Sequence, residues 1–167
     1  MAVERSNNDL KVGIADWKVA RVPQQIITLG LGSCVGIALF DQYSRVGGLA
    51  HIMLPDSTQF QRNENRAKYA DTALPDMLEE MLKFGARRSS IAAKIAGGAQ
   101  MFNFGDKNVT TLNIGERNVE ATKKVLEEMK IRLLAEDTRQ NYGRTMIFNL
   151  TDGDVYIRTI GKSLITL

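Results

Sequence analysis

The sequence predicts an α+β protein with a mixed or antiparallel sheet. Three observations support this class: apolar segments typical of strands cluster at both ends of the chain, two segments with helical spacing lie between them, and turn-forming residues separate neighbouring strand segments. A doubly wound fold would instead alternate strands and helices along the whole chain. The chain has 167 residues, of which 44% are hydrophobic and 25% charged, and this composition indicates one domain over residues 1–167. We expect about residues 1–10 to form a flexible tail.

The first third of the chain predicts a strand–turn–strand unit. Residues 25–29 form a short apolar run, and residues 35–40 form another after a glycine-rich bend. Residues 41–44 (Asp-Gln-Tyr-Ser) predict a hairpin turn, because Asp and Ser side chains bond the nearby backbone in turns. The chain then returns as a strand over residues 46–53, which stops at Pro55.

The middle of the chain predicts two helices. Apolar residues within 67–82 recur at spacings of three and four, and Gly85 is placed to end this helix. Pro75 lies inside the segment, so we expect either a kink or the meeting of two helices there. The second helix is expected at about residues 116–133, with acid–base pairs four residues apart at Glu120–Lys124 and Glu128–Arg132.

Two further segments predict strands. Alternation of apolar residues over 91–95 indicates a strand that runs up to the glycine pair Gly97-Gly98. Residues 144–150 and 154–160 are expected to form a C-terminal hairpin around a Thr-Asp-Gly turn. Strands therefore outnumber helices in the expected fold.

Composition excludes several classes of function. A single cysteine, Cys34, and a single histidine, His51, cannot build a disulfide framework or a structural zinc site. The net charge of +3 is spread along the chain, so we expect no nucleic-acid partner. No apolar run approaches the roughly 18 residues of a membrane helix, so we expect no membrane insertion. The first ten residues are polar and lack the apolar core of a secretory signal, which predicts a cytoplasmic protein.

The segment Thr28-Leu29-Gly30-Leu31-Gly32-Ser33-Cys34-Val35-Gly36 surrounds the only thiol with glycines. A glycine-rich bend can aim backbone N–H groups at one point, so N–H groups near Gly32 and Ser33 could form an oxyanion hole beside the sulfur. A dinucleotide fingerprint would have a third glycine where Val35 stands. A Walker motif is also absent, because no Gly-Lys-Ser/Thr follows.

His51 follows Cys34 across the expected hairpin. A nearby imidazole can take the proton of a thiol and so generate the nucleophilic thiolate. The two residues are therefore either a nucleophile with its base or two unrelated side chains. A third group would orient the imidazole, and the residue types leave Asp41, Asp56 and Thr28 open for this role.

Several motifs closely resemble the CheD family of chemoreceptor glutamine deamidases. The glycine-rich bend, together with residues 46–55 (Val-Gly-Gly-Leu-Ala-His-Ile-Met-Leu-Pro), gives the Cys and His the family's separation. Further motifs follow in the family's order along nearly the whole chain: residues 68–73 (KYADTA), 94–99 (KIAGGA), 114–118 (IGERN) and 143–144 (GR). The shared order makes the match specific.

The resemblance implies a catalytic triad with Cys34 as nucleophile, His51 as base and Thr28 as hydroxyl partner. It implies no metal or organic cofactor, and a fold similar to the catalytic domain of cytotoxic necrotizing factor toxins, with packed sheets flanked by helices. Two positions depart from the family's pattern: Ala96 often is Phe, and Arg139-Gln140 often is Gly-Gly. These departures bear on local loop shape and on partner contacts.

The implied reaction converts glutamines of methyl-accepting chemotaxis receptors to glutamate through a thioester on Cys34. The same thioester can form from a glutamate methyl ester, so methylesterase activity is a second reaction open to the site. The expected partners are the cytoplasmic helices of the receptors. The alternative function is a non-catalytic regulatory module that docks on CheC, a phosphatase of phosphorylated CheY, and stimulates it.

Overall fold

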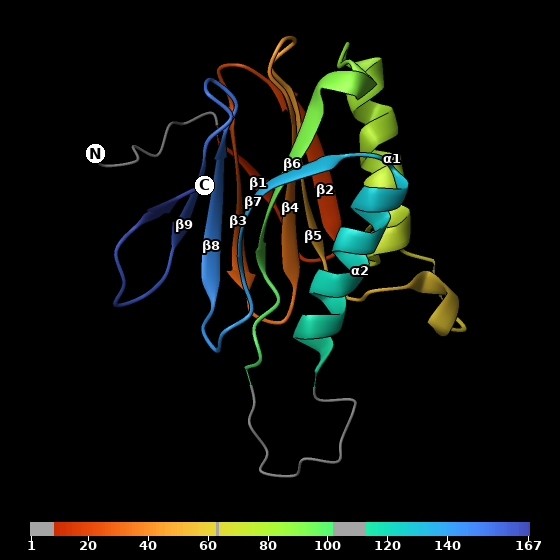
Figure 1. The fold of residues 1–167 in the computed structure, drawn as a ribbon, viewed down its shortest axis with the longest axis vertical. Helices are drawn as coiled ribbons and strands as arrows, with labels where there is room; N and C mark the ends of the chain where they lie inside the picture. Colours follow the sequence, from red (N-terminus) through yellow and green to blue (C-terminus); the bar gives the residue numbers. More distant parts are fainter. Residues whose placement is uncertain (1–8, 63, 102–112) are drawn as a thin grey trace.

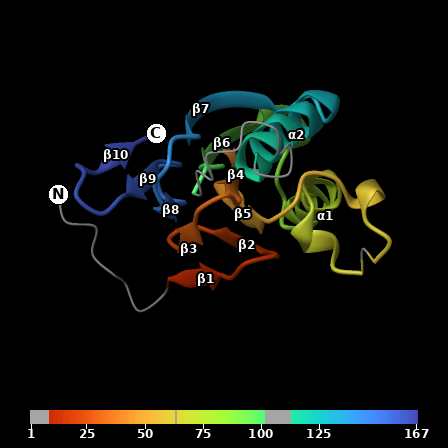
Figure 2. The same ribbon diagram turned by 90° about the horizontal axis from the view of Figure 1, so that it is seen from below.

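Two five-stranded sheets pack face to face, and two helices cover the outer face of one sheet, in the computed structural model of this chain (Figure 1). Figure 2 shows these three layers from below, with both helices on the same side. The structure describes residues 9–62, 64–101 and 113–167.

We call the sheet that packs against the helices the central sheet, because it lies between the helices and the other sheet. We call that other sheet, which no described helix covers, the outer sheet. The outer sheet has the order β1-β3-β8-β9-β10, in which only the β1–β3 pair is parallel. Its strands are β1 (Leu10–Val12), β3 (Gln25–Leu31), β8 (Arg144–Asn149), β9 (Val155–Arg158) and β10 (Ile165–Thr166). The central sheet has the order β2-β5-β4-β6-β7, in which only the β6–β7 pair is parallel. Its strands are β2 (Asp16–Arg21), β4 (Val35–Asp41), β5 (Val46–Ile52), β6 (Ile91–Gly97) and β7 (Arg132–Thr138).

The described helices lie between the strands of the central sheet in sequence. They are α1 (Ala70–Lys83) and α2 (Ile114–Glu128), with short 3-10 turns η1 (Ser57–Gln59), η2 (Arg66–Lys68) and η3 (Arg88–Ser90). Two mixed sheets and two helices make the fold α+β, as the sequence predicts.

The central sheet is buried on both faces. Along β4, Val35, Ile37 and Leu39 belong to the core cluster shared with α1 and α2, whereas Ala38 belongs to the cluster between the sheets. This division follows from the two-residue period of a strand. Side chains of the central sheet that face the outer sheet, such as Ala38 and Leu49, thus lie between two layers.

The two hairpins expected near the start and at the end of the chain are confirmed. β4 pairs with β5 across the turn that begins after Asp41, and β8 pairs with β9. The structure adds β1, β2, β7 and β10, which the sequence did not predict. Leu10, which we placed in the tail, begins β1; residues 1–8 lie outside the described residues.

The second helix ends earlier than predicted. α2 stops at Glu128, and Lys130 adopts a left-handed φ of 58°. The Ile131 N–H then donates to the Leu126 carbonyl at 2.9 Å, which closes the helix end. Arg132 therefore belongs to β7, and the predicted helical pair Glu128–Arg132 is wrong.

Pro75 does not divide the first helix. α1 runs from Ala70 to Lys83 through Pro75, so the expectation of two separate helices is wrong. Gly85 follows the helix with φ of 98°, in the left-handed region that glycine adopts without steric cost. The predicted end of this helix at Gly85 is confirmed.

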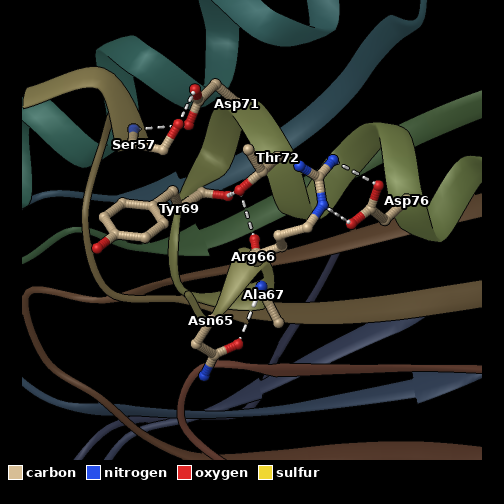
Figure 3. A network of polar contacts seen from close by, with 8 residues as sticks. All are labelled: Ser57, Asn65, Arg66, Ala67, Tyr69, Asp71, Thr72 and Asp76. Atoms are coloured by element: carbon tan, nitrogen blue, oxygen red, sulfur yellow. Dashed lines mark hydrogen bonds and ion pairs between the residues drawn. The ribbon is translucent and has the colours of Figure 1, made fainter. Parts of the chain in front are cut away.

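Polar contacts from the preceding loop stabilise the first turns of α1 (Figure 3). The Asp71 carboxylate accepts hydrogen bonds from the N–H and the hydroxyl of Ser57, at 2.9 and 2.7 Å. The Arg66 guanidinium pairs with both carboxylate oxygens of Asp76, at 2.8 and 2.9 Å. These contacts anchor the segment that leads out of β5 into α1.

Candidate active site

The candidate site lies between the two sheets, at the end of the β4–β5 hairpin opposite its turn. Gly36 on β4 pairs with His51 on β5. Both positions face the outer sheet, because they alternate in step with Ala38 and Leu49 of the core between the sheets. A Cβ at Gly36 would lie 2.6 Å from Met146 Sδ, so glycine permits the sheets to approach here.

Thr28 on β3 connects the His51 imidazole to the outer sheet. Its Oγ1 lies 2.7 Å from His51 Nδ1 and 2.8 Å from the Val12 carbonyl oxygen. A hydroxyl has one hydrogen and a carbonyl can only accept, so Thr28 donates its hydrogen to Val12. The second bond must then run from Nδ1–H of His51 to the Thr28 oxygen. This assignment leaves Nε2 of His51 as the unprotonated nitrogen.

The free nitrogen of His51 is buried without a partner. His51 is 0% exposed, and Nε2 has no hydrogen-bond partner among the described residues. An unpaired polar atom in such a place costs about 1–3 kcal/mol. A lone pair kept available at this cost is typical of a group that receives its partner during function.

Cys34 lies on the same face of the central sheet as His51. Its carbonyl oxygen accepts the Gly98 N–H at 2.8 Å, which continues the β4–β6 ladder beyond the first residue of β4. Cys34 precedes Gly36 by two residues and packs against the core between the sheets. It is thus the diagonal neighbour of His51, a relation that separates Cα atoms by roughly 7–8 Å. The thiol is free and Cys34 is partly exposed.

Burial determines the resting protonation of both residues. Burial raises the pKa of the Cys34 thiol, while the backbone N–H of the same residue acts in the opposite direction. Burial lowers the pKa of His51 to about 4. At neutral pH the site therefore holds a thiol and a neutral imidazole, which is the form that can accept a proton.

The two acids that remained open as partners of the imidazole are engaged elsewhere. Asp41 lies at the turn end of β4 and accepts three hydrogen bonds at 2.8–3.0 Å, from Tyr43, Ser44 and Arg87. The Asp56 carboxylate accepts the N–H and the hydroxyl of Thr58, at 2.8 and 2.7 Å, and so caps η1. Of the three candidates, the structure brings only Thr28 to His51 among the described residues.

The glycine-rich bend is held by short backbone contacts. The Gly32 N–H donates to the Gly30 carbonyl at 3.0 Å, and the Gly32 carbonyl accepts the Ala99 N–H at 2.8 Å. Gly30 has φ of 71°, a conformation that favours glycine. Gly32 thus shapes the bend, and Ser33 contributes its carbonyl oxygen to a contact with α2.

That contact comes from Asn118, to which the sequence analysis gave no role. Asn118 is 0% exposed, and its Nδ2 donates to the carbonyl oxygens of Ser33 and Met53, both at 2.9 Å. Ser33 precedes Cys34, and Met53 follows His51 by two residues. One amide therefore ties together the two segments that carry the candidate pair. The sequence signals were its place at the end of the motif at residues 114–118 and its position on the buried face of the second helix.

A polar cavity of about 390 Å³ is lined by Gly98, whose N–H donates to the Cys34 carbonyl oxygen. Arg139 and Gln140 line it with φ of 70° and 61°, in the region that glycine adopts readily. The Arg139 guanidinium pairs with both oxygens of Glu116, at 2.6 and 2.9 Å. The loop thus has a backbone shape that glycine adopts readily, with Arg139 and Gln140 at these two positions.

Ala96, the other position that departs from the family's pattern, lies in β6 and not in a loop. It is 0% exposed, pairs with Gly36 and lies in the core between the sheets. This departure from the pattern therefore lies in the core and within β6, and its bearing on partner contacts stays a prediction.

Within residues 9–62, 64–101 and 113–167, no group of three or more His, Cys, Asp or Glu residues is placed to hold a metal ion. None of the helices in these ranges combines the length and the apolar character needed to cross a membrane.

The fold and the site together define a class: an α+β protein that gathers a cysteine, a neutral histidine and a threonine hydroxyl between two packed sheets. Comparison with known proteins gives the family. The CheD family model, described as CheD chemotactic sensory transduction, matches residues 53–159. A Moorella thermoacetica protein named probable chemoreceptor glutamine deamidase CheD is 60% identical over 156 residues, 93% of each chain. A Clostridium botulinum protein of the same name is 56% identical over 153 residues, 92% of this chain and 94% of its own. The chain belongs to the CheD family.

Proposed function

We propose that this protein is a chemoreceptor glutamine deamidase in which Cys34 is the nucleophile and His51 the base. The observation that carries the proposal is the Thr28 hydrogen bond to Nδ1 of His51, which leaves Nε2 unprotonated on the face shared with Cys34. Relatives that are 56–60% identical carry the name of this activity and support the substrate class.

In the acylation step, Nε2 of His51 takes the proton of the Cys34 thiol as the sulfur attacks the amide carbon of a substrate glutamine. The carbonyl oxygen becomes an oxyanion and accepts a hydrogen bond from the Cys34 N–H, beside the bend formed by Gly32 and Ser33. The His51 imidazolium then protonates the amide nitrogen, and ammonia leaves. A thioester remains on Cys34.

In the deacylation step, His51 takes a proton from water, and the resulting hydroxide attacks the thioester carbon. The carbon–sulfur bond breaks, and His51 returns the proton to the Cys34 sulfur. The sum is glutamine plus water to glutamate plus ammonia. Thr28 holds the imidazole in one orientation and one tautomer through both steps.

A glutamate methyl ester can enter the same sequence, with methanol as the leaving group in place of ammonia. The oxyanion and the thioester are then the same as in deamidation. Methylesterase activity on receptors is therefore part of the proposal and is tested on the same sites.

The test uses purified cytoplasmic receptor fragments. Incubation with the protein should release ammonia and convert specific glutamines to glutamate, as followed by peptide mass spectrometry. Cys34→Ala should abolish both signals without unfolding the protein. Asp56→Asn is the matched control, because it changes an acid that we place outside the site, and it should retain activity. Full activity of Cys34→Ala would overturn the mechanism.

A further inference from the structure

We propose that Asn118 is a positioning residue that orients the Ser33–Cys34 peptide, so that the Cys34 N–H is aimed at the oxyanion of acyl transfer. The inference rests on the proposed function and assigns a role to a side chain outside the triad. Asn118 reaches the site from α2, on the opposite face of the central sheet from His51.

The argument begins with the planar peptide bond. In a trans peptide, the C=O and the following N–H point in opposite directions. Asn118 holds the Ser33 carbonyl oxygen toward the helix layer at 2.9 Å. The Cys34 N–H is therefore directed away from α2, toward the side where the thiol packs between the sheets. Its effect in lowering the pKa of the thiol agrees with a position close to the sulfur.

The same amide fixes this peptide relative to His51. The second Nδ2 hydrogen is donated to the Met53 carbonyl at 2.9 Å, directly after β5. A primary amide nitrogen has two hydrogens in one plane and can serve both carbonyls, whereas a hydroxyl has one. Asn118 thereby sets the distance between the bend and the strand that carries the base.

The double donation leaves the other end of the Asn118 amide unpaired. Asn118 Oδ1 is buried and has no hydrogen-bond partner among the described residues. An unpaired amide oxygen of this kind is destabilising, and an apolar side chain would avoid it on a helix face that packs on the core. The contribution to the reaction can be large, because loss of one oxyanion donor lowers kcat by about 100-fold to 1,000-fold.

The experiment compares Asn118→Ala with Thr122→Ala. Thr122 is the matched control because it lies one turn further along α2 and is also 0% exposed, and its Oγ1 has no hydrogen-bond partner among the described residues. Deamidation kinetics should show kcat lowered about 100-fold in Asn118→Ala, with KM within about threefold of the unchanged protein. Thr122→Ala should retain kcat.

A second readout separates orientation from general damage to the site. Alkylation of Cys34 by iodoacetamide consumes the thiol without forming an oxyanion. Its rate in Asn118→Ala should fall by less than about tenfold, because the misdirected Cys34 N–H favours the thiolate less, while kcat falls about 100-fold. A parallel fall of alkylation and kcat would overturn the proposal, and so would equal kcat values in the two alanine variants.

Two further outcomes are distinguishable. If Asn118→Ala is unfolded by circular dichroism, Asn118→Ser replaces it, because a serine retains one donor; an intermediate kcat supports the proposal, and an unchanged kcat overturns it. If the unchanged protein lacks deamidase activity on receptor fragments, the proposed function fails, and with it the role of Asn118. If the unchanged protein is active and Asn118→Ala equals it, only the role of Asn118 fails.

Discussion

Two completely buried ionisable side chains lie at opposite ends of the β4–β5 hairpin, and their surroundings differ. Asp41, at the turn, accepts hydrogen bonds from three neighbouring residues. Burial tends to raise the pKa of Asp41, but the hydrogen bonds from Arg87 and Ser44 hold it below its ordinary value. His51, at the open end, has one side-chain partner, Thr28, and burial lowers its pKa to about 4.

In the proposed mechanism, this difference gives Asp41 a stabilising role and His51 a reactive one. The carboxylate of Asp41 is satisfied in its charged form by hydrogen bonds from the turn and from Arg87, so it stabilises the turn. The imidazole of His51 is held neutral with Nε2 unpaired, so it can accept a proton. We therefore expect changes at the turn end to act on stability and changes at the open end to act on activity.

The largest expected effect is at the open end. His51→Gln should lower the rate of receptor deamidation at least about 1,000-fold, because the amide cannot act as a base. Ammonia release measures this rate. The free energy of unfolding in urea should change little at pH 7. A variant that retains more than a tenth of the activity would contradict the role of His51 as the base.

The next effect is at the turn end. Asp41→Asn should lower the free energy of unfolding by about 2 kcal/mol, because it removes the charge that accepts hydrogen bonds from Ser44 and from the Arg87 N–H. Urea denaturation measures this loss. The folded variant should keep its deamidase rate, and a loss of activity without loss of stability would remove the contrast between the two ends.

The two ends of the β4–β5 hairpin should lose their contributions to stability in different pH ranges. The folded-state pKa of His51, about 4, lies below its ordinary value of 6.5, so the folded state resists protonation. The contribution of His51 to the free energy of unfolding is fully present above pH 6.5 and is lost as the pH drops toward about 4. The loss is on the order of 2 kcal/mol at pH 5. Asp41 loses its contribution only at lower pH, as the pH falls through its depressed pKa. Urea denaturation at pH 7 and pH 5 should show the loss in the unchanged protein and not in His51→Gln; an equal loss in both would place its origin elsewhere.

A smaller effect is expected at the group that orients the base. Thr28→Val should lower kcat about tenfold to 100-fold, since a hydrogen bond of about 1–3 kcal/mol to the imidazole is lost. Thr28→Ser keeps the hydroxyl and serves as the matched control, with a rate close to that of the unchanged protein. Equal rates in the valine and serine variants would show that the hydroxyl does not orient His51.

The smallest effect lies beside the site. Gln140→Gly should raise the free energy of unfolding by up to about 1 kcal/mol, because a left-handed φ of 61° strains a residue with a Cβ. Arg139→Gly should give no such gain, because it also removes the ion pair with Glu116. Urea denaturation measures both. Destabilisation by Gln140→Gly would show that its side chain contributes contacts that outweigh the strain.

The parts of the fold that local patterns encode were predictable from the sequence. Alternation and turn chemistry predicted the β4–β5 hairpin and β6, and Gly85 marked the end of α1. The strand β7 was missed because we expected the preceding helix to continue through residue 133, and because residues 134–138 (Leu-Ala-Glu-Asp-Thr) show no alternation of apolar and polar residues. The helix ends where Lys130 adopts a left-handed backbone conformation. Lysine has no strong preference for this conformation, so the sequence did not mark the helix end.

The sequence by itself determined that only one thiol and one imidazole are present, that glycines surround the thiol, and that a hairpin separates the two. Its residue types left three candidates for the partner of the imidazole, and the family resemblance selected Thr28. Only the tertiary structure decided that Thr28 contacts His51, because the two lie in different sheets and meet through sheet packing. It also decided that Asn118 donates to both Ser33 and Met53, because one side chain spans segments 85 and 65 residues away. Such contacts depend on register and layer spacing, which local sequence periodicity does not encode.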